Sequence, residues 1–161
     1  MGMESYYITL EIDNLSSNNL RELFVQRYQV SAYKIRSSKF FRRYVVDDSR
    51  FVIDNKAVVT INTFQDLTNI IFELCFSNFD CNINYLYNVV LLISTLTEKA
   101  ILTVMNEKYN FKEMSLDAFK EIIMSKYSNK YNLFTRKYGK IEKDILPSNF
   151  YSQINRFGCH K

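Results

Sequence analysis

The chain of 161 residues contains one histidine, one proline, three glycines and no tryptophan. The histidine, His160, lies next to the last residue, so a histidine-based triad or a histidine-rich metal site is not expected. The glycines at positions 2, 139 and 158 are isolated, which excludes a glycine-rich phosphate-binding loop. Catalytic groups are usually carried on shaped loops, and this chain has little loop chemistry. We therefore expect no enzyme, no metal and no cofactor.

Long uninterrupted hydrophobic runs are also absent. The most apolar stretch, NYLYNVVLLISTL at residues 84–96, is interrupted by Asn88 and Ser94 and is followed at once by Glu98 and Lys99. A membrane-spanning helix needs about 20 nearly uninterrupted apolar residues, and the N-terminus has no signal-peptide core. We expect no membrane span within this sequence.

Cysteine is scarce and shows no pattern. Cys75, Cys81 and Cys159 do not have the spacing of metal ligands, and their odd number leaves a thiol unpaired. This usage fits a reduced, intracellular setting. Cys75 lies in a segment with helical periodicity, and we expect it to be a small buried residue.

The excess of charge of one sign is small, with 21 Lys and Arg against 17 Asp and Glu. Nucleic-acid-binding proteins usually carry a stronger and clustered basic excess, so we expect no nucleic-acid partner. One segment keeps that alternative open, because Lys34, Arg36, Lys39, Arg42 and Arg43 are interleaved with Tyr33, Phe40, Phe41 and Tyr44. A helix with a solvated basic face is the favoured interpretation. Binding to nucleic acid, with an affinity that falls steeply with salt, remains the second alternative.

Residues 1–161 are predicted to form one all-α domain. Apolar residues recur at helical spacing in 17–35, 37–48, 63–76, 84–106, 115–127, 129–139 and 147–158. Ser17, Thr63 and Ser115 are candidate helix starts, and Gly139 is a stop signal. Residues 4–13 are ambiguous. Residues 51–61, FVIDNKAVVTI, indicate a β-hairpin around Asp54-Asn55, although the helical surroundings argue against it.

The segment 84–106 is apolar on nearly all sides. A helix of this kind is buried in protein when it is not in lipid. We therefore predict that it is the central helix of a bundle of seven to eight helices, wrapped by amphipathic neighbours.

Residues 63–100 resemble the centre of the Bcl-2 family of apoptosis regulators, and most closely its divergent poxvirus members. That family has an amphipathic helix, a turn, an Asn-Trp-Gly-Arg sequence and a buried apolar helix. The first helix is matched by Thr63, Phe64, Gln65, Asp66, Leu67 and Phe72, and the second by Asn84, Tyr85, Val89, Val90 and Leu91. The family's Gly-Arg falls on Leu86 and Tyr87, so the usual arginine that pairs with an aspartate of the ligand is missing.

The resemblance implies a viral inhibitor of host apoptosis that binds the BH-3 helices of pro-apoptotic proteins of the Bim, Bak and Bax type in a hydrophobic groove. The groove residues would be Phe41, Tyr44, Val45, Leu67, Ile71, Asn84, Tyr87, Val90 and Ser94, with Arg42 or Arg43 as the charge partner of the ligand's aspartate. Such a protein would act in the host-cell cytoplasm, at the mitochondrial outer membrane if a C-terminal anchor follows, and could form a homodimer.

A first alternative keeps the fold and changes the partner. Some poxvirus proteins of this fold have a closed groove and bind host signalling adaptors to block innate immune signalling. Titration with a Bim-type peptide separates the two hypotheses, because only the first expects binding.

Overall fold

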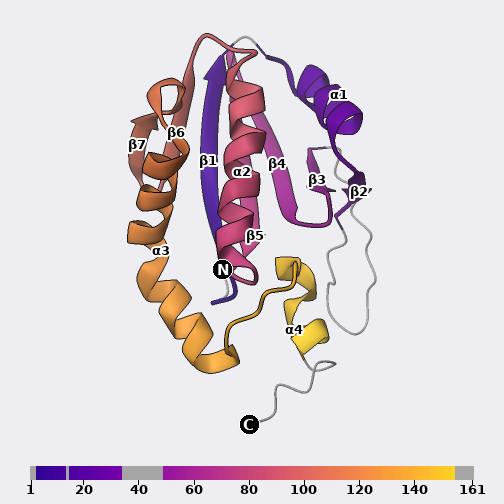
Figure 1. The fold of residues 1–161 in the computed structure, drawn as a ribbon. Coiled ribbons are helices and arrows are strands. Elements are labelled where there is room, and N and C mark those ends of the chain that lie inside the picture. Colours follow the sequence, from indigo (N-terminus) through magenta and orange to yellow (C-terminus); the bar gives the residue numbers. More distant parts are fainter. Residues whose placement is uncertain (1–2, 14, 34–48, 155–161) are drawn as a thin grey trace.

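The computed structural model describes residues 3–13, 15–33 and 49–154. Within these residues, seven strands form one antiparallel sheet in the order β2-β3-β4-β5-β1-β6-β7 (Figure 1). The predicted all-α, Bcl-2-like bundle of seven to eight helices is therefore wrong, and the chain is a mixed α/β protein. None of the helices in the described ranges combines the length and the apolar character that crossing a membrane requires.

The strands are β1 (Ser5–Asp13), β2 (Val30–Ala32), β3 (Arg50–Ile53), β4 (Ala57–Phe64), β5 (Leu67–Cys75), β6 (Ala100–Val104) and β7 (Glu107–Asn110). The α-helices are α1 (Ser17–Arg27), α2 (Phe79–Ser94), α3 (Leu116–Tyr138) and α4 (Phe150–Ile154), with 3₁₀ turns η1 (Phe111–Glu113) and η2 (Pro147–Asn149).

The centre of the sheet is the long pair β1 and β5. Their register runs from Ser5 opposite Cys75 to Asp13 opposite Leu67. Along β1, Ile8, Leu10 and Ile12 are fully buried while the residues between them are half-buried. This alternation is the period-two pattern of a sheet with one face on a core, and it settles the ambiguous segment 4–13 as a strand.

Two hairpins turn on pairs of residues with positive φ. Asp54 and Asn55 have φ of 48° and 54° between β3 and β4, and Met105 and Asn106 have φ of 46° and 73° between β6 and β7. Positive φ at both central residues of a turn matches the right-handed twist of the strands, and Asp and Asn tolerate it better than most residues. The connection between β6 and β7 consists of these two residues alone, whereas Lys56 adds a third residue between β3 and β4. Residues 51–61 thus form the hairpin that their local signal indicated, and the argument against it from helical surroundings is wrong.

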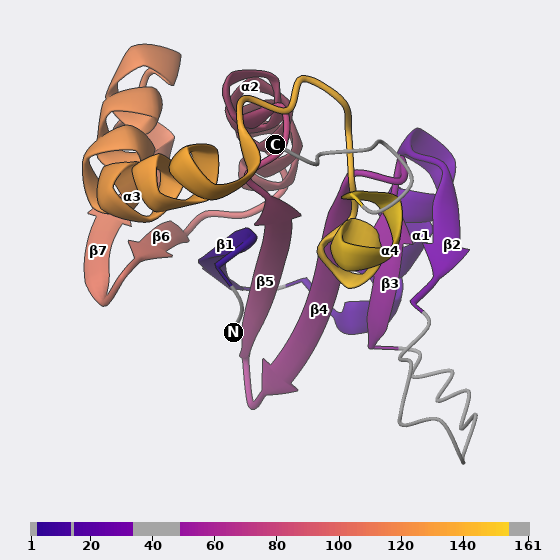
Figure 2. The same cartoon turned by 90° about the horizontal axis from the view of Figure 1, so that it is seen from below.

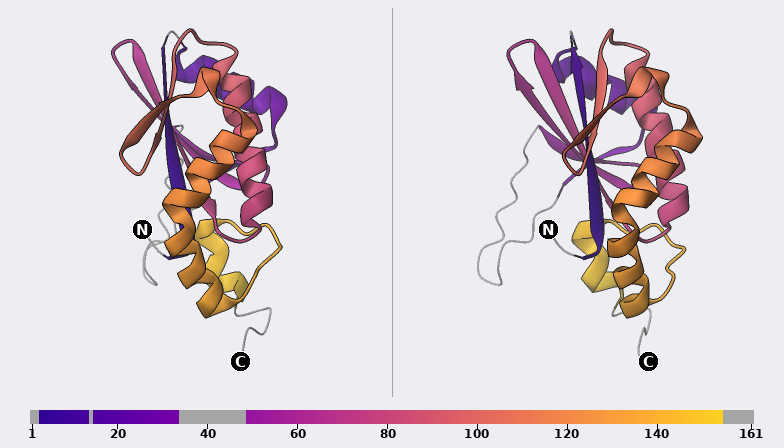
Figure 3. Two further views of the ribbon diagram at one scale, coloured as in Figure 1. Left: turned by 60° about the vertical axis from the view of Figure 1, so that its left-hand side comes forward. Right: turned by 90° about the vertical axis from the view of Figure 1, so that its left-hand side faces the viewer.

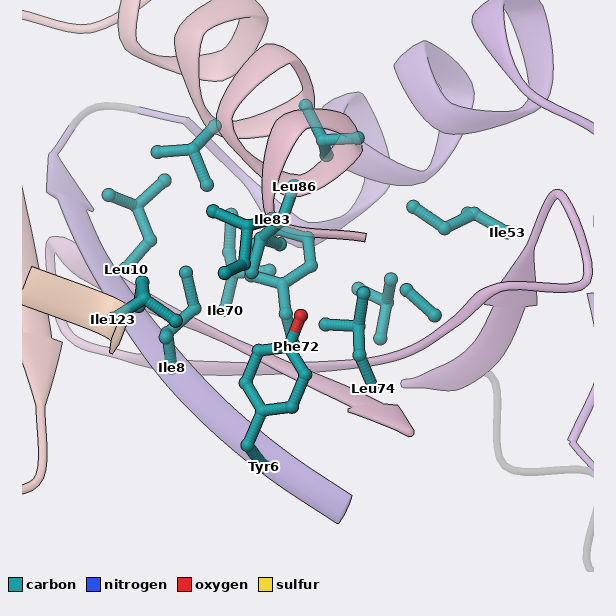
Figure 4. Close-up of a cluster of buried hydrophobic side chains, with 14 of the residues drawn as sticks. Tyr6, Ile8, Leu10, Ile53, Ile70, Phe72, Leu74, Ile83, Leu86 and Ile123 are labelled. Carbon is teal, nitrogen blue, oxygen red and sulfur yellow. The ribbon is translucent and has the colours of Figure 1, made fainter. Parts of the chain in front are cut away.

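The helices α1, α2 and α3 cover one face of the sheet and enclose the core (Figure 3). Figure 4 shows Ile8 and Leu10 of β1, Ile70 and Phe72 of β5, and Ile83 and Leu86 of α2 meeting in this layer. The start of α3 is capped by the Ser115 hydroxyl, which accepts from the Ala118 N–H at 3.2 Å, and its end is Gly139 at φ 79°. The start signal of the helix predicted over 115–127 and the stop signal of the helix predicted over 129–139 are confirmed, but the two predicted helices are one continuous helix, α3.

Residues 141–154 lie at the lower end of the sheet, near the start of α2 (Figure 2). The Ser77 hydroxyl accepts from the Ile145 N–H at 3.2 Å, and the Asn78 amide donates to Asp144 at 2.9 Å. Leu146 packs with Val52 and Val58 on the face away from the core, so this segment covers only the lower end of that second face.

The predicted helix 63–76 is instead the end of β4, a turn and β5. Ile70, Phe72 and Leu74 are fully buried, whereas Ile71 between them is on the opposite face. The stripe that suggested a helix had combined residues from both faces of a strand. Gln65, at φ 53°, makes the turn inside that segment.

Two other predicted helices end early. The helix predicted over 17–35 ends at Arg27, and β2 follows; the helix predicted over 84–106 starts at Phe79, ends at Ser94 and is followed by β6. α2 is not a central helix wrapped on all sides, because its buried side lies on the sheet and Leu91 on its outer side is 41 % exposed. The segments 37–48 and 155–158 lie outside the described residues.

Candidate binding surface

The sheet has a second face, which we term the open face. Helices α2 and α3 lie on the other side of the strands (Figure 3). Among the described residues, the open face is covered only at its lower end, where Leu146 packs against Val52 and Val58. Strand register and burial assign to it Tyr7, Thr9, Glu11, Asp13, Arg50, Thr60, Asn62, Phe64, Leu67, Asn69, Ile71, Glu73, Ile101, Thr103 and Lys108.

The middle of the open face is made of short uncharged side chains in transverse rows. In one row Thr60 lies opposite Ile71, Ile71 opposite Thr9, and Thr9 opposite Thr103. Side chains in neighbouring strands are close enough to act as one surface. The row therefore offers hydroxyl groups and a small apolar area, all about half-buried.

The adjacent row adds amides and one acid. Asn62 lies opposite Asn69, Asn69 opposite Glu11, and Glu11 opposite Ile101. Glu11 has the Lys99 ammonium at 2.7 Å and the Lys108 ammonium at 3.7 Å. The hydrogen bond from Lys99, opposed by partial burial, lowers the pKa of Glu11 below its ordinary value.

The other carboxylates of the open face also have partners. The Arg50 guanidinium lies 3.3 Å from the Glu73 carboxylate and 4.1 Å from the centre of the Tyr33 ring. Asp13 accepts from the Lys99 N–H at 2.9 Å. The charges of this face are thus compensated within it, which leaves its centre close to neutral.

Two apolar hairpin tips border the open face. Phe64, at the end of β4, is 72 % exposed, and Leu67 lies opposite it across the turn. Met105, in the turn between β6 and β7, is 50 % exposed. Both views of Figure 3 show these two tips on the side of the sheet away from α2 and α3.

The hairpin that carries Phe64 is held at its base. The Thr68 hydroxyl donates to the Leu15 carbonyl at 2.9 Å and lies 3.3 Å from the Thr63 hydroxyl. Thr68 is buried and Thr63 is exposed, so these hydrogen bonds are partly shielded from water. The tip is therefore presented on a fixed support, which limits the entropy lost when a partner covers it.

The residues predicted to line a groove are not brought together. Leu67 and Ile71 lie on the open face of β5, whereas Val90 and Ser94 are buried on the other side of the sheet. Tyr87 is half-buried, and its hydroxyl donates to the Met114 carbonyl at 3.1 Å. Asn84 of α2 is half-buried, and its side-chain oxygen is buried without a hydrogen-bond partner among the described residues. Phe41, Arg42, Arg43, Tyr44 and Val45 lie outside the described residues.

The groove prediction depended on a fold that this chain does not have. Binding of BH-3 helices is itself untested, but the described residues give it no structural support, and the assignment as a Bcl-2-like protein is withdrawn with the fold.

Sequence reasoning missed the polar rows of the open face. Thr9, Thr60 and Thr103 come from three separate segments, and only the pairing of β4 with β5, of β5 with β1 and of β1 with β6 brings them together. The local signal that could have found them is the alternation of apolar and polar residues in 5–13 and 67–75.

Comparisons with protein-family models, with curated proteins and with solved structures find no match for this chain. Within the described ranges, no group of three or more His, Cys, Asp or Glu side chains is placed to hold a metal ion.

Proposed function

We propose that this protein is a binding module without catalytic activity, and that it docks a partner protein on the open face. The observation that carries the proposal is a supported sheet face with a charge-compensated centre and a mostly exposed phenylalanine at its rim. Exposed aromatic residues next to a flat, desolvatable surface are typical of protein-binding sites.

Phe64 is the expected anchor of this interaction. Covering an exposed phenylalanine is worth about 1.5–3 kcal/mol, and Leu67 extends the same apolar patch. The threonine and asparagine rows can exchange hydrogen bonds with a partner without the large cost of stripping water from an unpaired charge. This combination matches the anatomy of a protein interface, with an apolar anchor and a core depleted of free charge.

The experiment uses a photo-crosslinking amino acid in place of Phe64, with the same substitution at Leu133 as the control. Leu133 is 51 % exposed and lies on α3, away from the open face. We expect a partner protein to be captured from Phe64 and not from Leu133. The affinity of the purified partner should then fall about 10-fold or more for Phe64→Ala, the loss typical of an interface anchor, and remain unchanged for Leu133→Ala. Equal capture from both positions, or an unchanged affinity of Phe64→Ala, contradicts the proposal.

Nucleic acid is the second candidate partner. It is favoured by the net charge of +4 and by the basic and aromatic residues within 33–44. Asparagine side chains and apolar wedges such as Phe64 are also used by proteins that bind the minor groove. We rank it second because acidic and basic side chains nearly balance within the described residues, whereas nucleic-acid interfaces are strongly positive.

Fluorescence anisotropy with labelled DNA and RNA tests this second candidate. Binding that weakens steeply between about 50 and 200 mM salt, and weakens further for Phe64→Ala, would assign the open face to nucleic acid. Absence of binding at low salt would remove this candidate.

A further inference from the structure

Positive charge is concentrated on the C-terminal half of α3 and just beyond its end. Residues 122–141 contain no Asp or Glu, and their five cations are Lys126, Lys130, Arg136, Lys137 and Lys140. This stretch alone therefore carries more positive charge than the net +4 of the whole chain. Clustered charge of one sign attracts partners of the opposite sign, so the side chains of this stretch were searched for a docking surface.

Lys126 and Lys130 are used within the fold. The Lys126 ammonium forms an ion pair with Glu107 of β7, and the Lys130 ammonium donates to the Ser5 carbonyl of β1. Both lysines are half-buried. They tie α3 to the sheet, and we assign them no docking role.

The other three cations are exposed and lie next to an exposed leucine. Arg136 and Lys137 follow Leu133 by three and four residues, which places the three side chains on one face of the helix. Leu133 is 51 % exposed, and Lys140 follows just after the helix end. We term these four residues the basic end of α3. Figure 1 and both views of Figure 3 show that the last turns of α3 reach past the end of the sheet.

We infer that the basic end of α3 docks on the surface of an anionic lipid bilayer, with its cations against the headgroups and Leu133 at the boundary with the acyl chains. Anionic headgroups attract clusters of Lys and Arg, and an exposed aliphatic side chain among them gains from entering the apolar layer. The helix dipole also favours cations in the last turn. It accounts neither for the exposed Leu133 nor for Lys140, which lies beyond the helix.

The composition of this surface selects lipid over other anionic partners. Lysine is depleted from protein interfaces, whereas two of the three exposed cations here are lysines. Proteins that bind single-stranded nucleic acid stack bases on aromatic rings. The exposed apolar side chain here is the aliphatic Leu133, to which a phosphate backbone offers no apolar contact. The neighbouring Tyr138 ring is half-buried, with the Lys137 ammonium 5.1 Å and the Phe150 ring 4.9 Å from its centre.

The basic end of α3 is separate from the open face. Figure 3 shows α3 on the opposite side of the sheet, so docking through its end leaves the open face accessible. The inference neither rests on the proposed function nor alters it. Leu133 also remains a valid crosslinking control there, because contact with lipid gives it no protein partner.

A fluorescence experiment tests the placement of Leu133. The chain has no tryptophan, so Leu133→Trp introduces a single emitter. With vesicles of phosphatidylcholine containing about one third phosphatidylserine, its emission should move to shorter wavelengths at low salt. With vesicles of phosphatidylcholine alone it should not move. Val25→Trp is the matched control, because Val25 is a 59 % exposed aliphatic residue on α1, and its emission should stay unchanged with both kinds of vesicle.

A second experiment tests the charges by sedimentation of the protein with the same vesicles. The paired change Arg136→Gln with Lys137→Gln should weaken binding about 25-fold, because each cation near an anionic surface is worth about 5-fold in affinity. Arg21→Gln with Arg27→Gln removes the same charge from exposed positions of α1 and should leave binding nearly unchanged. Circular dichroism checks that every variant is folded.

Fluorescence anisotropy with labelled DNA and RNA at the same salt tests the other anionic partner. We expect no binding that depends on Arg136 and Lys137. Nucleic-acid binding that this pair of changes abolishes, without binding to vesicles, would assign the surface to nucleic acid and overturn the inference. An unmoved emission of Leu133→Trp, an equal shift for Val25→Trp, or equal losses for the two charge pairs would also overturn it.

Discussion

Single residues set the alkaline limit of this fold. Tyr127 is buried, its hydroxyl donates to the Tyr7 carbonyl, and burial raises its pKa to about 12. Because the pKa is higher in the folded than in the unfolded state, its contribution is complete below about pH 10. That contribution is lost as the pH rises from about 10 towards 12.

The expected loss for this one group approaches 1.4 kcal/mol per pH unit within that window. Urea unfolding at neutral pH and at about pH 11 measures it. Tyr127→Phe should be less stable than the wild type at neutral pH by about 1 kcal/mol, the worth of the hydrogen bond, and the difference should shrink at high pH. A constant difference across the window would contradict the assignment. Tyr6 and Tyr85, whose pKa values are also raised by burial, keep some pH dependence in both proteins.

Asp54 combines an unusual backbone with two hydrogen bonds. It accepts from the Gln29 N–H at 2.8 Å and from the Tyr85 hydroxyl at 2.9 Å, and its φ is 48°. Asp54→Ala should lower the free energy of unfolding by about 2–4 kcal/mol, since it removes two hydrogen bonds to a charged group and leaves a side chain poorly suited to positive φ. Tyr85→Phe, which removes only one of these bonds, should cost about 1–2 kcal/mol. A larger loss for Tyr85→Phe than for Asp54→Ala would show that the turn is not held through Asp54.

At the scale of elements, a local sequence signal agreed with the structure where all of its residues lie in one helix or one hairpin. Ser115 and Gly139 marked the two ends of α3, although two separate helices were predicted there, and Asp54-Asn55 indicated the hairpin of β3 and β4 although the helical surroundings argued against it. The segment 63–76 was misassigned because Leu67, Ile70, Ile71 and Leu74 have helical spacing, although Ile70 and Leu74 lie on the core face of β5 and Leu67 and Ile71 lie on its open face. The pairing of β5 with β1 and β4 on both edges decided for the strand, and such pairing cannot be read from a short segment.

The cap of α3 gives a test at this scale. Ser115→Ala removes the acceptor for the Ala118 N–H and should lower the free energy of unfolding by about 1 kcal/mol. Ser125→Ala, in the exposed middle of the same helix, is the control and should change it by less than about 0.5 kcal/mol, because alanine is the better helix former. Thermal or urea unfolding measures both. Equal effects would mean that α3 does not begin at Ser115.

At the scale of the whole molecule, the two faces of the sheet place residues of the same type in different environments. Phe64 and Phe72 lie on the hairpin of β4 and β5, yet Phe64 is mostly exposed on the open face and Phe72 is fully buried against the helices. The sequence alone could name Leu67 and Ile71 as surface candidates, but their assignment to a helical groove was tied to the wrong fold. The open face exists only once distant strands are paired.

This separation predicts opposite outcomes for one substitution made at the two phenylalanines. Phe72→Ala should lower the free energy of unfolding by about 3–5 kcal/mol, because it leaves a cavity in a closely packed layer. Phe64→Ala should change it by less than about 0.5 kcal/mol, as expected for an exposed side chain, while it lowers partner affinity. Urea unfolding of the two purified variants measures the first effect, and binding to the captured partner measures the second.

If 63–76 were an amphipathic helix, Phe64 would share its buried stripe with Leu67 and Ile71, and Phe64→Ala would then be strongly destabilising. A large loss of stability for Phe64→Ala would therefore count against both the sheet and the open face, whereas stability retained together with lost binding separates the role of Phe64 from that of the core.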